Sequence, residues 1–265
     1  MHDDAELPSF DEAVASGATS SSSSQAGGFR TTFACMTRFN QDRLHFVDFP
    51  RSEVETVTAR IQAVWPKGIQ DSKQMATPGG WDVKIGGLPW AAVQCGPADG
   101  RVLLGGILEH LYNRGWVLHT SIAAFQHTYY GDTLIFRHQM PPPPPCDWLV
   151  VAFEKFDRLK IMPAPPDDLR ASLLRWLGSQ VQKSSSERDC AKDGFMEIKL
   201  NGQPWSAMSD QGVRTHLVLL KLLDAFQTTG FALYGSMRQQ QLLTQDVLVV
   251  HRQKDWRPGQ PVWQR

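Results

Sequence analysis

The sequence predicts an α+β protein built from two tandem copies of one unit, and three observations support this prediction. The segment Lys84–Trp90 (KIGGLPW) resembles Lys199–Trp205 (KLNGQPW), which lies 115 residues further along the chain. The same offset aligns Asp42–Leu44 with Asp157–Leu159. Strand-like and helix-like hydrophobic patterns also follow one another in the same order in both halves. A long repeat of this kind constrains the architecture before any residue propensity is considered.

The repeat divides the chain into a tail, two units and a linker. Residues 1–28 hold five acidic residues, no Lys or Arg, and a run of five serines, so we expect a disordered tail. The first unit spans residues 29–140 and the second spans residues 148–265. The linker, residues 141–147, begins with five prolines that favour a polyproline II spacer. Each unit has about 100 residues, which is enough to bury a core of its own.

The first unit is predicted to start with two strands and a helix. The strands are expected at Phe33–Phe39 and Leu44–Phe49, around a turn at residues 40–42. Ser52 and Glu55 fit the S-x-x-E pattern of a capping box, so the helix is expected to begin there. Apolar residues then recur at helical spacing as far as Trp65. In the second unit, the corresponding helix is expected to begin near Asp167.

The repeated motif is predicted to form a β-hairpin. In the first copy, a strand ending at Ile85 would turn through Gly86-Gly87 and return as a second strand that includes Trp90. In the second copy the turn would be Asn201-Gly202, and both turns suit the primed types that need positive φ. The polar segments Ile69–Pro78 and Ser184–Asp193 are predicted to be loops.

Each unit is predicted to end with a helix and two strands. The helices are expected at Arg101–Asn113 and Val213–Thr228, each followed by a glycine at the C′ position. The whole unit then reads ββαββαβ(β). Without its first and last strands this is the β-α-β-β-α-β series of the ferredoxin-like, split βαβ order. We expect the helices to cover one face of each sheet.

Composition and motifs exclude several classes of protein. The 27 basic and 27 acidic residues argue against a strongly basic binder of nucleic acid or membrane surfaces. The four cysteines are scattered and form no C-x-x-C pair, so neither a zinc site nor a disulfide framework is expected. There is no signal-peptide pattern, and no apolar run approaches the ~18 residues of a spanning helix. These features predict a soluble protein of the cytosol or nucleus.

The sequence contains none of the common catalytic signatures. Phosphate-binding glycine loops, zinc-protease motifs and the G-x-S-x-G elbow are absent, and the histidines are spread over different predicted elements. No catalytic residue, metal ligand or cofactor is therefore assigned. Gly105-Gly106 lies inside a predicted helix and indicates close packing of that helix on a sheet.

Six residues of the two units are candidates for ligand or partner contact: Trp90, Trp205, Trp116, Tyr234, Arg43 and Arg158. A structural alternative exists for most of them. A tryptophan just past a hairpin turn commonly anchors that hairpin to the core. An Asp-Arg pair commonly marks a turn that leads into a strand. In the tail, Leu7, Pro8 and Phe10 resemble the Pro-x-Tyr peptides that WW domains bind, with phenylalanine in place of tyrosine.

The leading hypothesis is a non-enzymatic protein-interaction or adaptor module with a regulatory tail. Its partners would be other proteins, and nucleic acid is not expected to be among them. The alternative is a protein that binds a small apolar molecule or lipid in a cleft between the two units. A third hypothesis is an enzyme whose motif is not recognisable from one sequence.

Overall fold

The computed structural model describes residues 32–91, 99–125, 129–187, 194–206, 210–238 and 246–262. These residues include both repeats. The predicted disordered tail and its candidate peptide Leu7, Pro8 and Phe10 lie outside the described residues.

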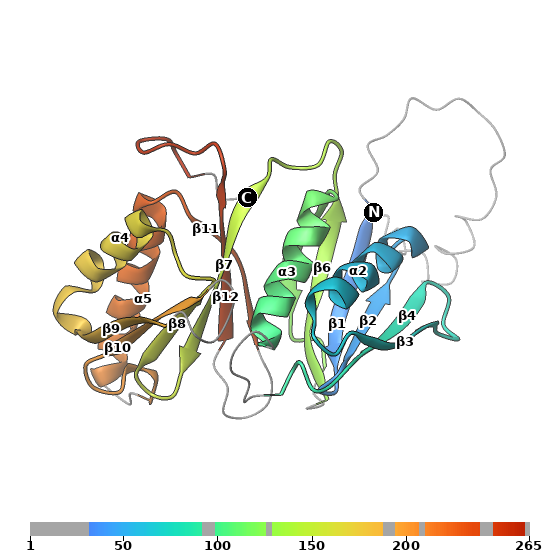
Figure 1. The fold of residues 1–265 in the computed structure, drawn as a ribbon, viewed down its shortest axis with the longest axis horizontal. Coiled ribbons are helices and arrows are strands. Elements are labelled where there is room, and N and C mark those ends of the chain that lie inside the picture. The colour runs from blue at the N-terminus through green and yellow to red at the C-terminus, as the bar shows by residue number, and fades with distance from the viewer. Residues whose placement is uncertain are drawn as a thin grey trace, which may run out of the picture. The chain divides into compact units, whose positions relative to one another are not determined.

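The two repeats contain the same series of helices and strands (Figure 1). The first repeat comprises β1 (Phe33–Phe39), β2 (Arg43–Val47), α2 (Arg51–Val64), β3 (Ile69–Gln74), β4 (Gly80–Ile85), α3 (Gly100–Asn113), β5 (Trp116–Ile122) and β6 (Tyr130–His138). The second comprises β7 (Cys146–Glu154), β8 (Arg158–Met162), α4 (Asp167–Leu177), β9 (Val181–Glu187), β10 (Phe195–Leu200), α5 (Asp210–Thr228), β11 (Ala232–Arg238) and β12 (Asp246–Gln253). Two 3₁₀ turns, Gly178–Gln180 and Pro204–Ser206, complete the second repeat.

Each repeat forms one six-stranded antiparallel sheet with the same strand order. The first sheet has the order β3-β4-β2-β1-β6-β5, and the second, read from β9, has the corresponding order β9-β10-β8-β7-β12-β11. Even the register is repeated, because Met36 pairs with Phe46 as Val151 pairs with Ile161. The predicted α+β duplication is therefore confirmed.

The ferredoxin-like order holds along the chain but not across the sheet. In a ferredoxin-like sheet the strand after the second helix would pair with the strand before the first helix. Here β1 and β6 lie between β2 and β5 in the first sheet. The tight turn between β1 and β2 makes them neighbours, so β1 occupies the edge of β2 where β5 would otherwise pair.

The predicted hairpin is wrong in one of its strands. The hairpin partner of β4 is β3, which precedes it, and β2 lies on its other side. Residues 86–91 turn without forming a strand, and the end of the predicted return strand, residues 92–93, lies outside the described residues. β9 and β10 pair in the same way, so both segments that were predicted to be loops contain strands. β3 is an edge strand whose residues are mostly exposed, and it therefore lacks the apolar alternation that reveals a half-buried strand.

Two local predictions also need correction. Only the second residue of each repeated turn has positive φ, with values of 78° for Gly87 and 74° for Gly202, so the turns are not of type I′. The capping box is absent as well. Helix α2 begins at Arg51 with Pro50 as its N-cap, which places Ser52 inside the first turn, where it does not cap the helix.

The helices of each repeat pack together on one face of their own sheet. Leu44, Phe46, Val83 and Ile85 of the first sheet share a core with α2 and α3. In the second sheet, Leu159, Ile161, Met196 and Ile198 share a core with α4 and α5. The first of these cores also contains residues of the second repeat, because α3 has a second contact surface.

Candidate functional site

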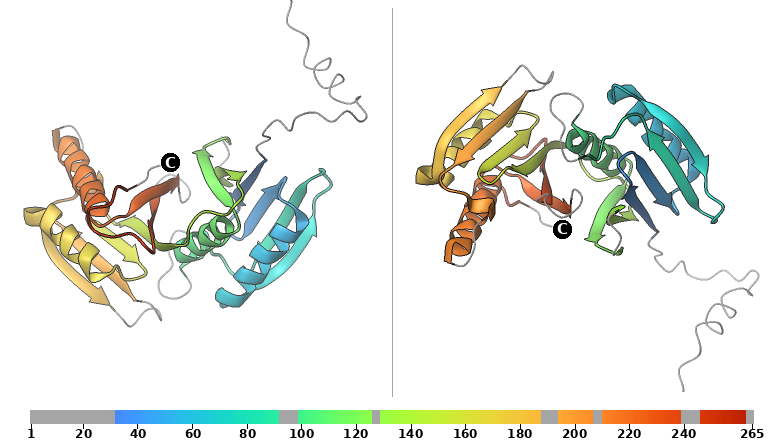
Figure 2. Two further views of the ribbon diagram at one scale, coloured as in Figure 1. Left: turned by 90° about the horizontal axis from the view of Figure 1, so that it is seen from above. Right: turned by 90° about the horizontal axis from the view of Figure 1, so that it is seen from below.

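Helix α3 packs between the two sheets and contacts both of them. Its inner side lies against the first sheet, and its outer side contacts β7 of the second sheet (Figure 2). A Cβ atom on Gly105 would lie 2.6 Å from Cγ2 of Val150, so the helix approaches the strand closely at this glycine. We call this contact the seam, and on the second sheet it comprises Val150, Ala152, Lys160, Met162 and Phe195. The predicted role of Gly105 in close packing is supported, but the sheet it approaches belongs to the other repeat.

A network of four charged residues lies at the N-terminal end of α3. Asp99 caps the helix, because its Oδ1 accepts a hydrogen bond of 2.9 Å from the backbone N–H of Arg101. The Arg101 guanidinium donates to both carboxylate oxygens of Asp99 and lies 2.7 Å from Oε1 of Glu154. Lys160 places its ammonium group 3.8 Å from Asp99 and 4.3 Å from the ring centre of Phe195. The network thus connects the first repeat with β7 and β8 of the second.

The side chains of this network are largely buried. The side chains of Asp99, Lys160 and Arg101 are only 3%, 6% and 11% exposed. Burial alone would lower the pKa of Arg101, but the hydrogen bonds and negative charges of Asp99 and Glu154 raise it above its ordinary value. Arg101 therefore stays charged, and the seam depends on the carboxylates that face it.

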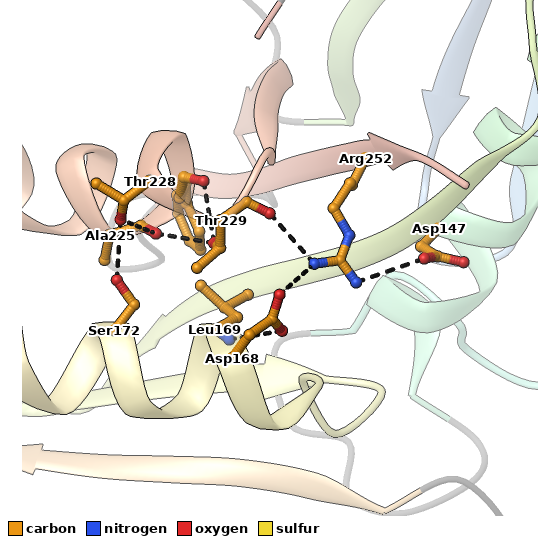
Figure 3. Close-up of polar contacts among 9 residues, drawn as sticks. Asp147, Asp168, Leu169, Ser172, Ala225, Thr228, Thr229 and Arg252 are labelled. Atoms are coloured by element: carbon orange, nitrogen blue, oxygen red, sulfur yellow. Dashed lines mark hydrogen bonds and ion pairs between the residues drawn. The ribbon is translucent and has the colours of Figure 1, made fainter. Parts of the chain in front are cut away.

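A second polar group lies around Arg252, at the end of β12 (Figure 3). Its guanidinium donates 2.6 Å to Oδ2 of Asp168 and 3.2 Å to the carbonyl oxygen of Thr229, and lies 3.7 Å from Asp147. The same guanidinium lies over the ring of Phe231, 4.6 Å from its centre. Arg252 thus joins the start of α4 and the end of α5 to strand β7.

Strand β11 of the second repeat also contacts the first repeat. The hydroxyl of Tyr234 accepts a hydrogen bond of 2.8 Å from the backbone N–H of Leu118. Arg38 donates to the carbonyl oxygen of Arg238. Burial lowers the pKa of Arg38 to about 10, although the negative charge of Asp132 opposes this shift. These contacts add a second attachment between the repeats.

A cleft of about 810 Å³ lies beside the seam and is lined by both repeats. Its walls combine apolar side chains such as Trp148 and Phe231 with the cationic residues Arg60 and Lys254. Glu109 of α3 also lines the cleft. Burial raises the pKa of Glu109 above its usual range, and the negative charge of Asp147 adds to this effect against the positive charges of Arg60 and Lys254.

Trp90 and Trp205 make the same contacts in the two repeats. The indole N–H of Trp90 donates 3.0 Å to the carbonyl oxygen of Arg43, and that of Trp205 donates 3.0 Å to the carbonyl oxygen of Arg158. The backbone N–H groups of the two tryptophans donate to the preceding turns, at Gln41 and Phe156. Each tryptophan therefore fastens the turn between the first two strands of its repeat.

The repeated charged residues complete this fastening. Arg43 pairs with Asp82 across β2 and β4, and Arg158 pairs with Glu197 across β8 and β10. Each repeat also has a Lys–Asp pair from the same motif, Lys84 with Asp42 at 3.9 Å and Lys199 with Asp157 at 3.8 Å. The motif that reveals the duplication is thus structural. In each repeat the tryptophan, the arginine pair and the Lys–Asp pair hold the turn between the first two strands, and we call this set of contacts the clamp.

The six predicted site residues do not form one site. Trp90 with Arg43 and Trp205 with Arg158 belong to the two clamps. Trp116 is buried in the first core, 4.7 Å from the rings of Phe49 and His138. Of the six, Tyr234 contacts the other repeat at Leu118.

Sequence reasoning missed the charged residues of the seam. At the offset of 115, Asp99 corresponds to Arg214, Lys160 to His45 and Glu154 to Phe39. Residues that are alike in both copies reveal the repeat, whereas the charged residues of the seam differ between the copies. The sequence does contain this difference in residue type at equivalent positions, and it marks the positions where the two copies have different neighbours.

The ranges that the structure describes contain neither a metal-binding cluster nor a membrane-spanning helix. No group of three or more His, Cys, Asp and Glu side chains there could hold a metal ion. No helix in the same ranges is long and apolar enough to cross a membrane.

Fold and seam together define a tandem α+β duplication, and a family comparison agrees. One family model of a domain matches the chain twice, over residues 32–137 and 147–255. The chain therefore belongs to this family, with two copies of its domain. Comparisons with curated proteins and with solved structures found no significant match.

Proposed function

We propose that the chain is a non-enzymatic protein-interaction module and that the outer side of α5 is its binding surface. The observation that carries this proposal is the exposure of four apolar side chains on that helix. Val213, Leu217, Leu220 and Leu223 are 62%, 53%, 57% and 40% exposed. We call these four residues the α5 face.

The spacing of these residues makes the α5 face a continuous apolar stripe. Positions 213, 217 and 220 recur at the i, i+4, i+7 spacing of one helix side, opposite Val218 and Leu222 in the core. Contiguous exposed apolar stripes on a protein surface commonly mark interaction sites. The non-enzymatic part of the proposal is supported by the seam, whose charged groups pair with one another.

The proposal is tested with a photo-crosslinking amino acid in the full-length chain in cells. Placed at Leu217, a benzophenone side chain is expected to form a UV-dependent covalent adduct with a protein that binds the α5 face. The control position is Arg51, a highly exposed residue at the start of α2. Equal adduct yields at the two positions would show that the α5 face has no preferred partner.

A second candidate function is binding of a small apolar molecule or lipid, which the size and apolar walls of the cleft favour. A cleft of about 810 Å³ at an interface between repeats lies within the usual range for ligand sites. Val102 of α3 lines this cleft, and Leu217 is its counterpart on α5.

This pair of equivalent positions supplies a matched test of ligand binding. Native mass spectrometry of the protein mixed with a lipid extract is expected to show a bound mass for the wild type and for Leu217→Trp. The mass should be lost for Val102→Trp, because the indole ring fills part of the cleft. A wild-type protein without any bound mass would refute the candidate.

A further inference from the structure

We propose that the α5 face docks on the open face of the first sheet of a second copy, so that copies associate head to tail. This inference rests on the proposed interaction function and names its partner. It follows from the way in which the two repeats already pack within one chain.

The seam supplies the template for this contact. It joins the outer side of a helix in the first repeat to the outer face of the sheet in the second repeat. Such a contact is heterologous, because the two surfaces differ. The seam buries the outer side of α3 and the outer face of the second sheet. The equivalent surfaces, on α5 and on the first sheet, have no such contact within the described residues of the chain.

The unused helix side is the α5 face. On α3, Gly105 is buried at the seam, Glu109 is partly buried and Val102 is 42% exposed beside the cleft. Their counterparts at the offset of 115 are Leu220, Asp224 and Leu217. All three counterparts are exposed. Thus Gly105, which α3 buries against the second sheet, is replaced on α5 by the exposed Leu220, with Leu217 and the charged Asp224 also exposed.

The unused sheet face belongs to the first sheet. The seam residues Val150, Lys160 and Met162 correspond to Cys35, His45 and Val47, all of which are partly exposed. Exposed aromatic side chains flank these residues, including Phe33, which is 47% exposed. An aromatic cluster continues the face, with the ring centres of Phe39 and His45 4.6 Å apart and those of Phe125 and Tyr130 4.1 Å apart.

The two unused surfaces complement one another in size. In the seam a glycine of the helix, Gly105, faces the branched side chain of Val150. In the proposed contact the corresponding pair is Leu220 and Cys35, so that the larger side chain is on the helix and the smaller one on the sheet. A helix can therefore pack closely on a sheet in the proposed contact as well, with the large side chain on the helix and the small one on the strand.

The charge on the helix is reversed between the two copies, whereas the charges on the first sheet are paired with one another. In the seam the helix supplies Asp99 and the sheet supplies Lys160. On α5 the counterpart of Asp99 is the exposed Arg214, and on the first sheet the carboxylate of Asp82 lies 3.6 Å from His45, the counterpart of Lys160. The Oδ1 atom of Asp82 is buried and has no hydrogen-bond partner in the part of the chain that is described. Arg214 would thus approach a carboxylate that Arg43 already pairs with, so the charge of Asp82 adds little to the contact.

Head-to-tail contacts predict a specific behaviour in solution. Because each copy has one α5 face and one open sheet face, association can continue beyond a dimer into longer chains or closed rings. The average mass of the full-length protein in light scattering is expected to rise with concentration. A wild-type protein that stays monomeric at every concentration would overturn the inference, whereas adducts of the α5 face with another protein would still support the proposed function.

Two variants and their mixture separate this geometry from a symmetric dimer. Leu217→Glu with Leu220→Glu removes the α5 face, and Phe33→Glu with Val47→Glu removes the sheet face. Each double variant alone is expected to be monomeric, and an equimolar mixture is expected to form a heterodimer, because one intact face of each kind remains. If the sheet-face variant assembles like the wild type, the inference is wrong.

A crosslinking experiment avoids the risk that a glutamate variant fails to fold. With Cys95 and Cys190 replaced by serine, Leu220→Cys is expected to form a disulfide with Cys35 of the next copy under mild oxidation. The product on a non-reducing gel should be a ladder of dimers, trimers and longer species, whereas the control Gln227→Cys should give none. Dimers alone would indicate that two α5 faces pair with each other, which contradicts the inference.

Discussion

Replacing Asp99 by alanine is expected to lower the free energy of unfolding by about 3–5 kcal/mol, as is usual when one partner of a buried ion pair is removed. The change leaves Lys160 and Arg101 buried without the carboxylate that faces both. It also removes the N-cap of α3, which contributes about 1 kcal/mol of that loss. Urea unfolding followed by circular dichroism measures the effect.

Two further variants identify the cause of this loss. Arg214→Ala, at the equivalent exposed position of α5, should change the stability by less than about 0.5 kcal/mol. Adding Lys160→Met to Asp99→Ala should restore part of the loss, because the unpaired ammonium group is replaced by an apolar side chain of similar length. A loss below about 1 kcal/mol for Asp99→Ala would show that solvent stabilises the two cations without their carboxylate.

Replacing Gly105 by leucine is expected to lower the free energy of unfolding by about 3 kcal/mol, which is the upper part of the range for overpacked sites. Even a Cβ atom at this position would lie 2.6 Å from Val150, so the larger side chain must push α3 away from β7. The better helix propensity of leucine offsets only about 1 kcal/mol of this cost. Thermal and urea unfolding of the purified protein measure the difference.

The neighbouring glycine supplies the control for this experiment. A Cβ atom on Gly106 would meet no atom within 4 Å, so Gly106→Leu should be neutral or should stabilise the protein by up to about 1 kcal/mol. Combining Gly105→Leu with Val150→Ala should recover part of the stability, because the two side chains compete for one space. Equal effects at Gly105 and Gly106 would contradict the close approach at the seam.

The sequence was sufficient to predict what lies within each repeat. Both copies carry the apolar stripes of their helices, and each places a glycine with positive φ at position 87 or 202. The strand β3 was missed because an exposed edge strand has no apolar alternation to reveal it, and β9 was missed because its sequence, VQKSSSE, is polar after its first residue. The order of the strands in the sheet could not be predicted either, because hydrophobic periodicity does not show which strands are neighbours.

The site was harder to predict than the fold because it lies between the repeats. Asp99 and Lys160 are 61 positions apart in the sequence and share no motif, so only the packing of α3 on the second sheet, chiefly on β7, brings them together. Trp90 and Trp205 drew attention as candidate ligand contacts because they are repeated, yet their indole groups fasten turns. The residues that the two copies share are those that each copy needs for folding. The residues that differ between the copies include those where the two repeats contact each other.

The core around α3 also limits how this protein can change over generations. Ordinary tandem domains can be copied, deleted or transferred to other genes one at a time, because each carries its own core. Here Val150, Met162 and Val249 of the second repeat belong to the same core as Leu44 and Phe46 of the first. A gene fragment encoding one repeat would leave part of this shared core exposed to solvent, so we expect loss of either repeat to be selected against.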